Sequence, residues 1–326
     1  MKPLEGAIGW LITDGKAGHE AQAQGVAEAL GLHYAWRRVV PEKFARLLAP
    51  WGPVSKDFKQ NFVPPWPDVA IGIGRTAMPY LRRVHRLAGL ATFTVALQDP
   101  RTSDRIADLI WLPEHDRRRG PNVITTLTSP HRFTPQMLDE LRSEPDAAID
   151  ELPTPRIMVA IGGAAKVWRF TDEDASQLAA AIGSMGREGA SFMVTTSRRT
   201  PSSVAAAVNQ ALQQFPHILY AGEGPNPYAR FLARSDAIIV TADSVSMTGE
   251  ALSSGRPVYV FRPTGGSDKF RRFHDALHAR GATRLLNEDH HMSFDWAHPP
   301  IFAADSIARA IAERFLNRRQ YVKRAL

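Results

Sequence analysis

Short apolar runs recur along the chain and alternate with longer helical patterns. Runs of about four to eight apolar, β-branched residues between turn residues are typical of buried strands. The predicted strands are residues 8–13, 69–73, 92–97, 109–112, 156–161, 191–195, 217–220, 237–240 and 258–261. Strands that are apolar on both faces belong to parallel sheets covered by helices, so the pattern predicts an α/β protein with parallel sheets.

The region 236–266 has the strongest ligand-binding pattern. A hydroxyl-rich loop and about two turns of helix separate its two predicted strands. Backbone N–H groups at a helix start favour an anion such as a phosphate, and Ser244, Ser246 and Thr248 surround this helix start. Glu250 lies about one turn further on, where a carboxylate can accept hydrogen bonds from both ribose hydroxyls. These four residues are predicted to bind a nucleotide; the alternative is an ordinary helix cap and a solvated Glu.

Two other strand ends in the second half supply residues for the same nucleotide. Gly162 and Gly163 follow the strand 156–161, and small residues let a backbone approach a phosphate closely. Lys166 could neutralise that phosphate. Arg198 follows the strand 191–195 and could form a forked contact with a diphosphate. Lys269, near the start of a later helix, is predicted to reach phosphate or acceptor.

A glycine-rich turn, residues 14–20, follows the first predicted strand. It is neither a P-loop nor a Gly-x-Gly-x-x-Gly dinucleotide fingerprint. Histidine exchanges protons readily near neutral pH, so His19 is a candidate base for an acceptor hydroxyl, with Asp14 as an alternative. The other interpretation is that His19 caps the helix or orients the loop. Lys16 fits a phosphate or an acceptor acid better than a proton transfer.

Polar residues also follow three other strands of the first half. They are Arg75, Asp99 and His115. The carboxyl ends of parallel strands meet at one edge of a sheet, which is the usual ligand site of open α/β sheets. These residues are therefore predicted to lie on the acceptor side of the site.

Residues 236–266 resemble the carboxyl-terminal domain of two-domain GT-B glycosyltransferases of the peptidoglycan N-acetylglucosaminyltransferase type. That family has a Ser/Thr-rich loop, a Glu on the following helix, a Gly-x-Pro and a strand that ends in Pro. The matching residues are Ser244, Thr248, Glu250, Gly255, Pro257 and Pro263. The first glycine-rich turn is similar too, with Gly18, His19, Gly25, Ala27 and Leu30 at the family's spacing.

This resemblance implies two Rossmann-like domains that face a central cleft. It implies a first, acceptor-side domain at 1–150, a nucleotide-sugar domain at 151–304, and a terminal helix at 305–326 that packs back on the first domain. The acidic, proline-punctuated stretch 143–155 is the predicted linker. The resemblance also implies that His19 lies at the mouth of the cleft and that Asn226 contacts the base.

The whole chain is also similar to bacterial members of the plant elongated-mitochondria fission family. That resemblance leaves a non-enzymatic scaffold at a membrane or fission site as an alternative function. Aromatic residues stand among prolines and lysines at 44–67, which fits either a membrane-touching edge or an irregular insertion packed on its own domain. The basic end of the terminal helix could likewise rest on anionic lipid.

Composition narrows the remaining choices. The net charge of +7 favours acidic partners such as a nucleotide-sugar or an anionic membrane surface, and no nucleic-acid motif is present, so no nucleic acid is expected. The absence of cysteine excludes disulfides, thiolate zinc sites and cysteine nucleophiles. No Asp-x-Asp or His cluster suggests a metal. No signal peptide and no apolar run of about 18 residues is visible, which predicts a cytoplasmic protein, peripheral on the inner face of a membrane.

The sequence therefore predicts a metal-independent, inverting glycosyltransferase without a cofactor. Its co-substrate would be a nucleotide-diphosphate sugar, UDP-linked by resemblance, and its acceptor an envelope or lipid-linked molecule. The alternatives are the scaffold and a nucleotide-sugar epimerase built on the same two domains.

Overall fold

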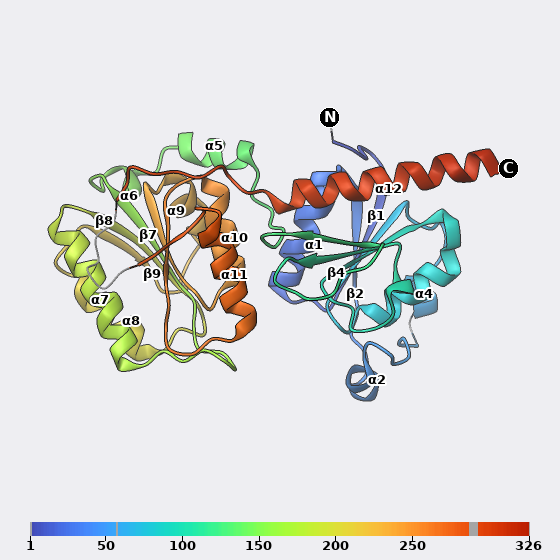
Figure 1. The fold of residues 1–326 in the computed structure, drawn as a ribbon, viewed down its shortest axis with the longest axis horizontal. Helices are drawn as coiled ribbons and strands as arrows, with labels where there is room; N and C mark the ends of the chain where they lie inside the picture. The colour runs from blue at the N-terminus through green and yellow to red at the C-terminus, as the bar shows by residue number, and fades with distance from the viewer. Residues whose placement is uncertain (1, 57, 287–292, 326) are drawn as a thin grey trace. The chain divides into compact units, whose positions relative to one another are not determined.

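The computed structural model describes residues 2–56, 58–286 and 293–325. The chain forms two compact units, of which the first comprises Met1–Arg132 and Phe302–Leu326 and the second Phe133–Ile301. Each unit contains one six-stranded sheet in which every strand pair is parallel (Figure 1). This arrangement confirms the predicted α/β class with parallel sheets.

The first unit has the strand order β2-β1-β3-β4-β5-β6. Its strands are β1 Ile8–Thr13, β2 His33–Arg38, β3 Val69–Ile73, β4 Phe93–Leu97, β5 Leu109–Pro113 and β6 Val123–Thr126. Its helices are α1 Ala17–Leu30, α2 Lys43–Leu48, α3 Phe58–Asn61, α4 Met78–Ala88, η1 Gly89–Ala91, η2 Asp104–Ile106 and α12 Ala303–Ala325. The edge strands β2 and β6 were not predicted, because their partly exposed, polar sequences lack the apolar run of a central strand.

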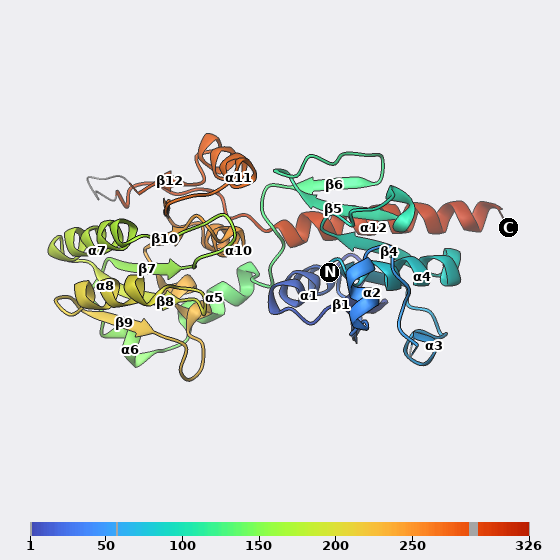
Figure 2. The same cartoon turned by 90° about the horizontal axis from the view of Figure 1, so that it is seen from below.

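The central strands of this sheet are buried on both faces. Alternate residues such as Leu11 and Val95 pack with α1 and α12, while Ile12 and Ala96 pack with α4 on the other side (Figures 1 and 2). Helix α12 contributes Ile307, Ile311 and Phe315 to the first of these clusters. The last helix of the chain therefore completes the core of the first unit.

The second unit has the strand order β12-β11-β10-β7-β8-β9. Its strands are β7 Arg156–Ile161, β8 Ser191–Thr196, β9 His217–Tyr220, β10 Ala237–Thr241, β11 Val258–Phe261 and β12 Arg284–Leu285. Its helices are α5 Pro135–Ser143, α6 Ala147–Asp150, α7 Asp172–Arg187, α8 Ser202–Leu212, α9 Tyr228–Arg234, α10 Val245–Ala251, η3 Leu252–Ser254 and α11 Asp268–Ala279. The stretch 143–155, predicted as a linker, holds α6 and belongs to this unit.

Candidate functional site

Two loops at the carboxyl edge of the second sheet are joined through Asp243. The Gly163 N–H donates to Oδ2 of Asp243 over 2.9 Å, and the Thr241 hydroxyl donates to Oδ1 over 2.7 Å. The Thr241 hydroxyl in turn accepts from the Gly162 N–H at 2.8 Å. Asp243 is only 7% exposed. The loop after β7 is thus fixed to the loop after β10 by side chains that follow a buried strand.

The two glycines of the β7 loop are required by close packing. A Cβ on Gly162 would lie 2.2 Å from Oδ2 of Asp243, and one on Gly163 would lie 2.2 Å from the Arg199 carbonyl oxygen. Both N–H groups donate to side chains of the second unit, as described above. In the structure, these glycines allow the loop after β7 to pack closely against its neighbours. Their contact with a phosphate stays a prediction.

Burial raises the pKa of Asp243. Hydrogen bonds from Gly163 and Thr241 and the charge of Arg199 act in the opposite direction but do not outweigh the desolvation. The sequence interpretation singled out the hydroxyls of this loop and missed the carboxylate. An acidic residue directly after an apolar strand was the signal available.

Helix α10 uses two of its predicted ligand hydroxyls internally. The Ser244 hydroxyl caps the helix by accepting from the Met247 N–H at 3.3 Å. The Thr248 hydroxyl is buried and donates to the Ser244 carbonyl oxygen over 2.9 Å. Ser246, by contrast, is exposed. Of these three hydroxyls, that of Ser246 therefore faces solvent and is accessible to a ligand.

Glu250 on α10 interacts with Tyr228, the first residue of α9. The Tyr228 hydroxyl is buried, and desolvation together with the nearby Glu250 charge raises its pKa well above the ordinary value. Tyr228 is therefore neutral, and its buried hydroxyl lies near the Glu250 carboxylate. Asn226, the predicted base contact, is exposed and accepts from the Tyr228 N–H at 3.0 Å, so it sets the start of α9.

The cationic candidates of the second unit are exposed: Lys166, Arg198 and Lys269. Lys166 lies in a loop that is tied to the loop after β11, since the Gly266 N–H donates to the Val167 carbonyl oxygen at 2.7 Å. The buried Asp174 strengthens this connection by accepting from the N–H and the hydroxyl of Thr264. The backbone that carries Lys166 is therefore held to the loop after β11.

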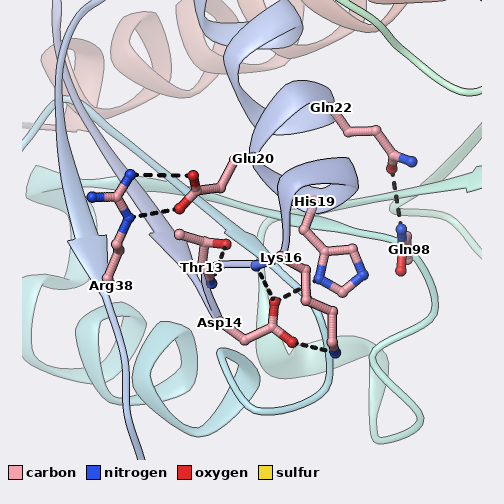
Figure 3. Close-up of polar contacts among 9 residues, drawn as sticks. Thr13, Asp14, Lys16, His19, Glu20, Gln22, Arg38 and Gln98 are labelled. Atoms are coloured by element: carbon pink, nitrogen blue, oxygen red, sulfur yellow. Dashed lines mark hydrogen bonds and ion pairs between the residues drawn. The ribbon is translucent and has the colours of Figure 1, made fainter. Parts of the chain in front are cut away.

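In the first unit, Asp14 brings two of the predicted residues together (Figure 3). Its carboxylate lies 2.8 Å from Nδ1 of His19 and 2.6 Å from Nζ of Lys16. Burial alone would raise the pKa of Asp14, but the hydrogen bonds and charges of Lys16 and His19 hold it below its ordinary value. A carboxylate can only accept, so Nδ1 of His19 donates the proton in this hydrogen bond, and an imidazole that carries its proton on Nδ1 has its lone pair on Nε2.

Gly74 makes room for this His19–Asp14 pair. It has a φ of +87°, and a Cβ built on it would lie 2.7 Å from Nδ1 of His19. Two further contacts hold the surrounding loop: Glu20 pairs with Arg38 at 2.7 Å, and Gln98 donates to Gln22 at 3.1 Å (Figure 3). The contact between Gly74 and His19 was not predictable, because the glycine and the histidine are far apart along the chain.

Two of the remaining acceptor-side candidates, Arg75 and Asp99, make contacts within the first unit. Arg75 donates to the Arg46 carbonyl oxygen at 3.3 Å. Asp99 accepts from the Arg101 N–H at 2.8 Å and pairs with Arg118 at 3.3 Å. His115 is 8% exposed. Their predicted acceptor contacts stay predictions.

Among the residues that the structure describes, no group of three His, Asp or Glu side chains could hold a metal ion. Within the same residues, no helix is long and apolar enough to cross a bilayer.

Several solved structures are similar in fold to this chain. UDP-GlcNAc 2-epimerase of Methanocaldococcus jannaschii is 10% identical with a TM-score of 0.59, over 94% of this chain and 99% of that one. The Neisseria meningitidis UDP-GlcNAc 2-epimerase bound to UDP-GlcNAc is 12% identical with a TM-score of 0.53, over 95% and 99%. Arabidopsis thaliana UGT89C1 complexed with UDP-L-rhamnose is 14% identical with a TM-score of 0.51, over 95% and 90%. These similarities establish the fold class, namely two Rossmann-like domains of the GT-B type.

The chain belongs to the mitochondrial fission ELM1 family, because its residues 17–315 match the model of that family. It is 30% identical to mitochondrial fission protein ELM1 of Arabidopsis thaliana over 285 residues, which cover 78% of this chain and 66% of the plant protein. It is 27% identical to the uncharacterized protein RP120 of Rickettsia prowazekii, over 93% of this chain and 97% of that one. These matches confirm the family resemblance seen in the sequence.

Proposed function

We propose that this protein is a metal-independent, inverting glycosyltransferase that uses a nucleotide-diphosphate sugar. The observation that carries the proposal is the His19–Asp14 pair. Its 2.8 Å hydrogen bond directs the proton on Nδ1 of His19 to Asp14 and leaves Nε2 as a proton acceptor. A histidine held in this tautomer by a carboxylate is the arrangement that a general base for a hydroxyl requires.

In the proposed reaction, the acceptor hydroxyl oxygen attacks the anomeric carbon while its proton passes to Nε2 of His19. The bond from that carbon to the diphosphate breaks, and the nucleoside diphosphate leaves with the electron pair. One displacement inverts the configuration at this carbon. The carboxylate of Asp14, at 2.8 Å, stabilises the imidazolium that forms.

We assign the donor to the second unit. Glu250, which lies near the buried Tyr228 hydroxyl, is the proposed acceptor of the ribose hydroxyl hydrogen bonds. The exposed Lys166 and Arg198 are the proposed counter-charges for the leaving diphosphate, with Ser246 at the start of α10. With cationic side chains in this role, no metal ion is needed. Asn226 is the proposed base contact.

The UDP-linked identity of the donor is drawn from the structural relatives. One is bound to UDP-GlcNAc and another is complexed with UDP-L-rhamnose. We propose an envelope or lipid-linked acceptor, met by Lys16, Arg75, Asp99, His115 and Lys269. We also propose that the reaction takes place in the cytoplasm, on the inner face of a membrane.

Isothermal titration with UDP, UDP-sugars and other nucleotides tests the donor site. Glu250→Ala should weaken UDP binding about tenfold or more, because the ribose loses a charged acceptor. Glu173→Ala removes an exposed carboxylate on α7 and serves as the matched control, with affinity unchanged. Equal affinity in wild type and Glu250→Ala would refute the role of Glu250, and a wild type that binds no nucleotide would refute the class.

A second candidate is a nucleotide-sugar epimerase, favoured by the TM-score of 0.59 with the Methanocaldococcus jannaschii enzyme. Product analysis separates the two, since an epimerase alters the donor sugar and never transfers it. The family's name favours a third candidate, a non-enzymatic fission-associated scaffold. Nucleotide-independent association with its partner membrane, without turnover of any donor, would support that candidate instead.

A further inference from the structure

The segment around α2 exposes large apolar side chains. Val40, Phe44, Leu47 and Trp51 are 87%, 70%, 74% and 63% exposed. We call these four residues, with Lys43 and Arg46 between them, the α2 patch. Single exposed apolar residues are ordinary on a protein surface, but several together mark an interaction site.

The patch is held in place by specific contacts. Two arginines of the neighbouring segment fix its backbone, since Arg75 donates to the Arg46 carbonyl oxygen and Arg82 to the Trp51 carbonyl oxygen, both at 3.3 Å. The turn after α2 closes through the Gly52 N–H, which donates to the Leu48 carbonyl oxygen at 3.0 Å. The backbone contacts therefore hold the apolar side chains in their exposed positions.

The same segment buries other aromatic residues. Phe58 and Phe62 are 4% and 5% exposed and stack with ring centroids 4.7 Å apart, next to Tyr80 in the core of the first unit. Of the six residues of α2, only Ala45 is buried. Within the first unit, α2 projects away from the helices that cover its sheet (Figure 1). Phe58 and Phe62 therefore anchor this segment in the core of the first unit, whereas α2 is exposed.

The charge pattern decides what this patch binds. Lys43, Arg46, Lys56 and Lys59 are exposed in or beside it, while the sequence from 40 to 59 has two acidic residues, Glu42 and Asp57. Centres of protein–protein interfaces are depleted of lysine. Tryptophan and apolar residues beside Lys and Arg are instead typical of segments that lie at the headgroup level of an anionic bilayer.

We propose that the α2 patch docks this protein on an anionic lipid bilayer. Phe44, Leu47 and Trp51 would enter the boundary between headgroups and acyl chains, while Lys43 and Arg46 contact lipid phosphates. The proposal stands on the surface alone and does not depend on the transferase activity.

Vesicle flotation of the full chain tests it, with vesicles of phosphatidylcholine alone or of phosphatidylcholine and phosphatidylglycerol in equal amounts. Wild type should float with the anionic vesicles, and less at high salt. The double variant Phe44→Ser/Leu47→Ser should lower the partition about tenfold or more, because both side chains lose their apolar contact with lipid. Leu90→Ser, which changes a 67% exposed residue on η1, is the matched control and should bind as wild type does.

A second variant, Lys43→Gln/Arg46→Gln, should reduce binding to anionic vesicles severalfold, since each basic residue near the surface adds attraction. Thermal unfolding shows whether the double apolar variant folds. If it does not, the binding of Lys43→Gln/Arg46→Gln tests the proposal in its place. Wild type that stays unbound, or patch variants that bind as well as wild type, would overturn the proposal. So would light scattering that shows a dimer of wild type dissociated by the apolar variant, because a second copy would then be the occupant.

Discussion

At the scale of single residues, the two units use their carboxylates in opposite ways. The pKa of Asp14 is lowered, because Lys16 and His19 favour its charged form. The pKa of Asp243 is raised, because its burial outweighs the hydrogen bonds that it accepts. Asp14 is therefore suited to stabilise a cationic histidine, and Asp243 to join loops of the second unit.

Asp14→Asn tests the role of the His19–Asp14 pair. The amide no longer fixes the tautomer or stabilises the imidazolium, so turnover should fall about a hundredfold or more. Donor affinity should be unchanged, because the proposed donor contacts lie in the second unit. Initial rates at saturating acceptor, together with calorimetric affinities, separate the two effects.

The neighbouring Glu20→Gln, which weakens only the contact with Arg38, is the control for this variant. The lowered pKa of Asp14 also sets a pH limit. Its ionised form, and the stability that the pair contributes, should persist above the ordinary value of 3.8 and be lost as the pH falls through the lower folded value. A wild type that loses turnover through Asp14 near neutral pH would contradict this assignment.

At the scale of elements, the loops of the second sheet are held by side chains as well as by backbone hydrogen bonds such as that from Gly266 to Val167. The capping box of α7 shows how one carboxylate connects two elements. Asp174 accepts from the Thr171 N–H at 2.7 Å and from the Thr264 N–H at 3.1 Å. A helix cap thus also positions the loop after β11, which lies beside the loop of Lys166.

Asp174→Ala should therefore lower the free energy of unfolding by more than the loss of an ordinary helix cap does. It leaves the N–H groups of Thr171 and Thr264 without their acceptor, which should lower the free energy of unfolding by about 2–3 kcal/mol. Asp172 is an exposed acid in the first turn of the same helix, and Asp172→Ala should lower the free energy of unfolding by about 0.5 kcal/mol.

Urea unfolding of both variants measures this difference. The pKa of Asp174 is lowered because its hydrogen bonds from Thr171 and Thr264 outweigh the desolvation that would raise it. The contribution of Asp174 to stability should be complete at pH values above its ordinary pKa of 3.8, and it should be lost as the pH falls through the lower pKa of the folded state. Equal losses in the two variants would show that the link to Thr264 adds nothing.

At the scale of the whole molecule, the first unit is built from two separate segments of the chain. Residues 302–326 return to it after the second unit is complete, and Ile307, Ile311 and Phe315 are almost fully buried there. The stability of the first unit consequently depends on the last helix of the chain. That dependence follows from burial of apolar area, which does not require neighbours in sequence.

Ile311→Ala should reveal this dependence. The cavity and the lost apolar contact should cost about 2–5 kcal/mol. Hydrogen exchange should accelerate in β3, β4 and β5, and remain slow in β7 and β10 of the second unit. Leu316→Ala, at a position 47% exposed on the same helix, should change stability by less than about 0.5 kcal/mol. Equal acceleration in both sheets would contradict two separate cores.

The sequence by itself determined the buried strands, because a strand that is apolar on both faces is recognisable without knowing its neighbours. The hydroxyl-rich loop and the His19 turn could be located as well, since they follow such strands directly, while the roles of these loops and of Glu250 in a site stay predictions. The edge strands β2, β6 and β12 could not, because they are short or polar and exist through their pairing with a neighbour.

Tertiary structure alone decided which groups meet. Gly163 and Asp243 are 80 residues apart in sequence, and no local pattern shows that one donates to the other. The same holds for Gly74 beside His19, for Tyr228 against Glu250, and for the exposed position of Phe44 while Phe62 is buried. Apolar periodicity specifies which side chains leave water, but the partner of a polar group depends on how distant segments pack.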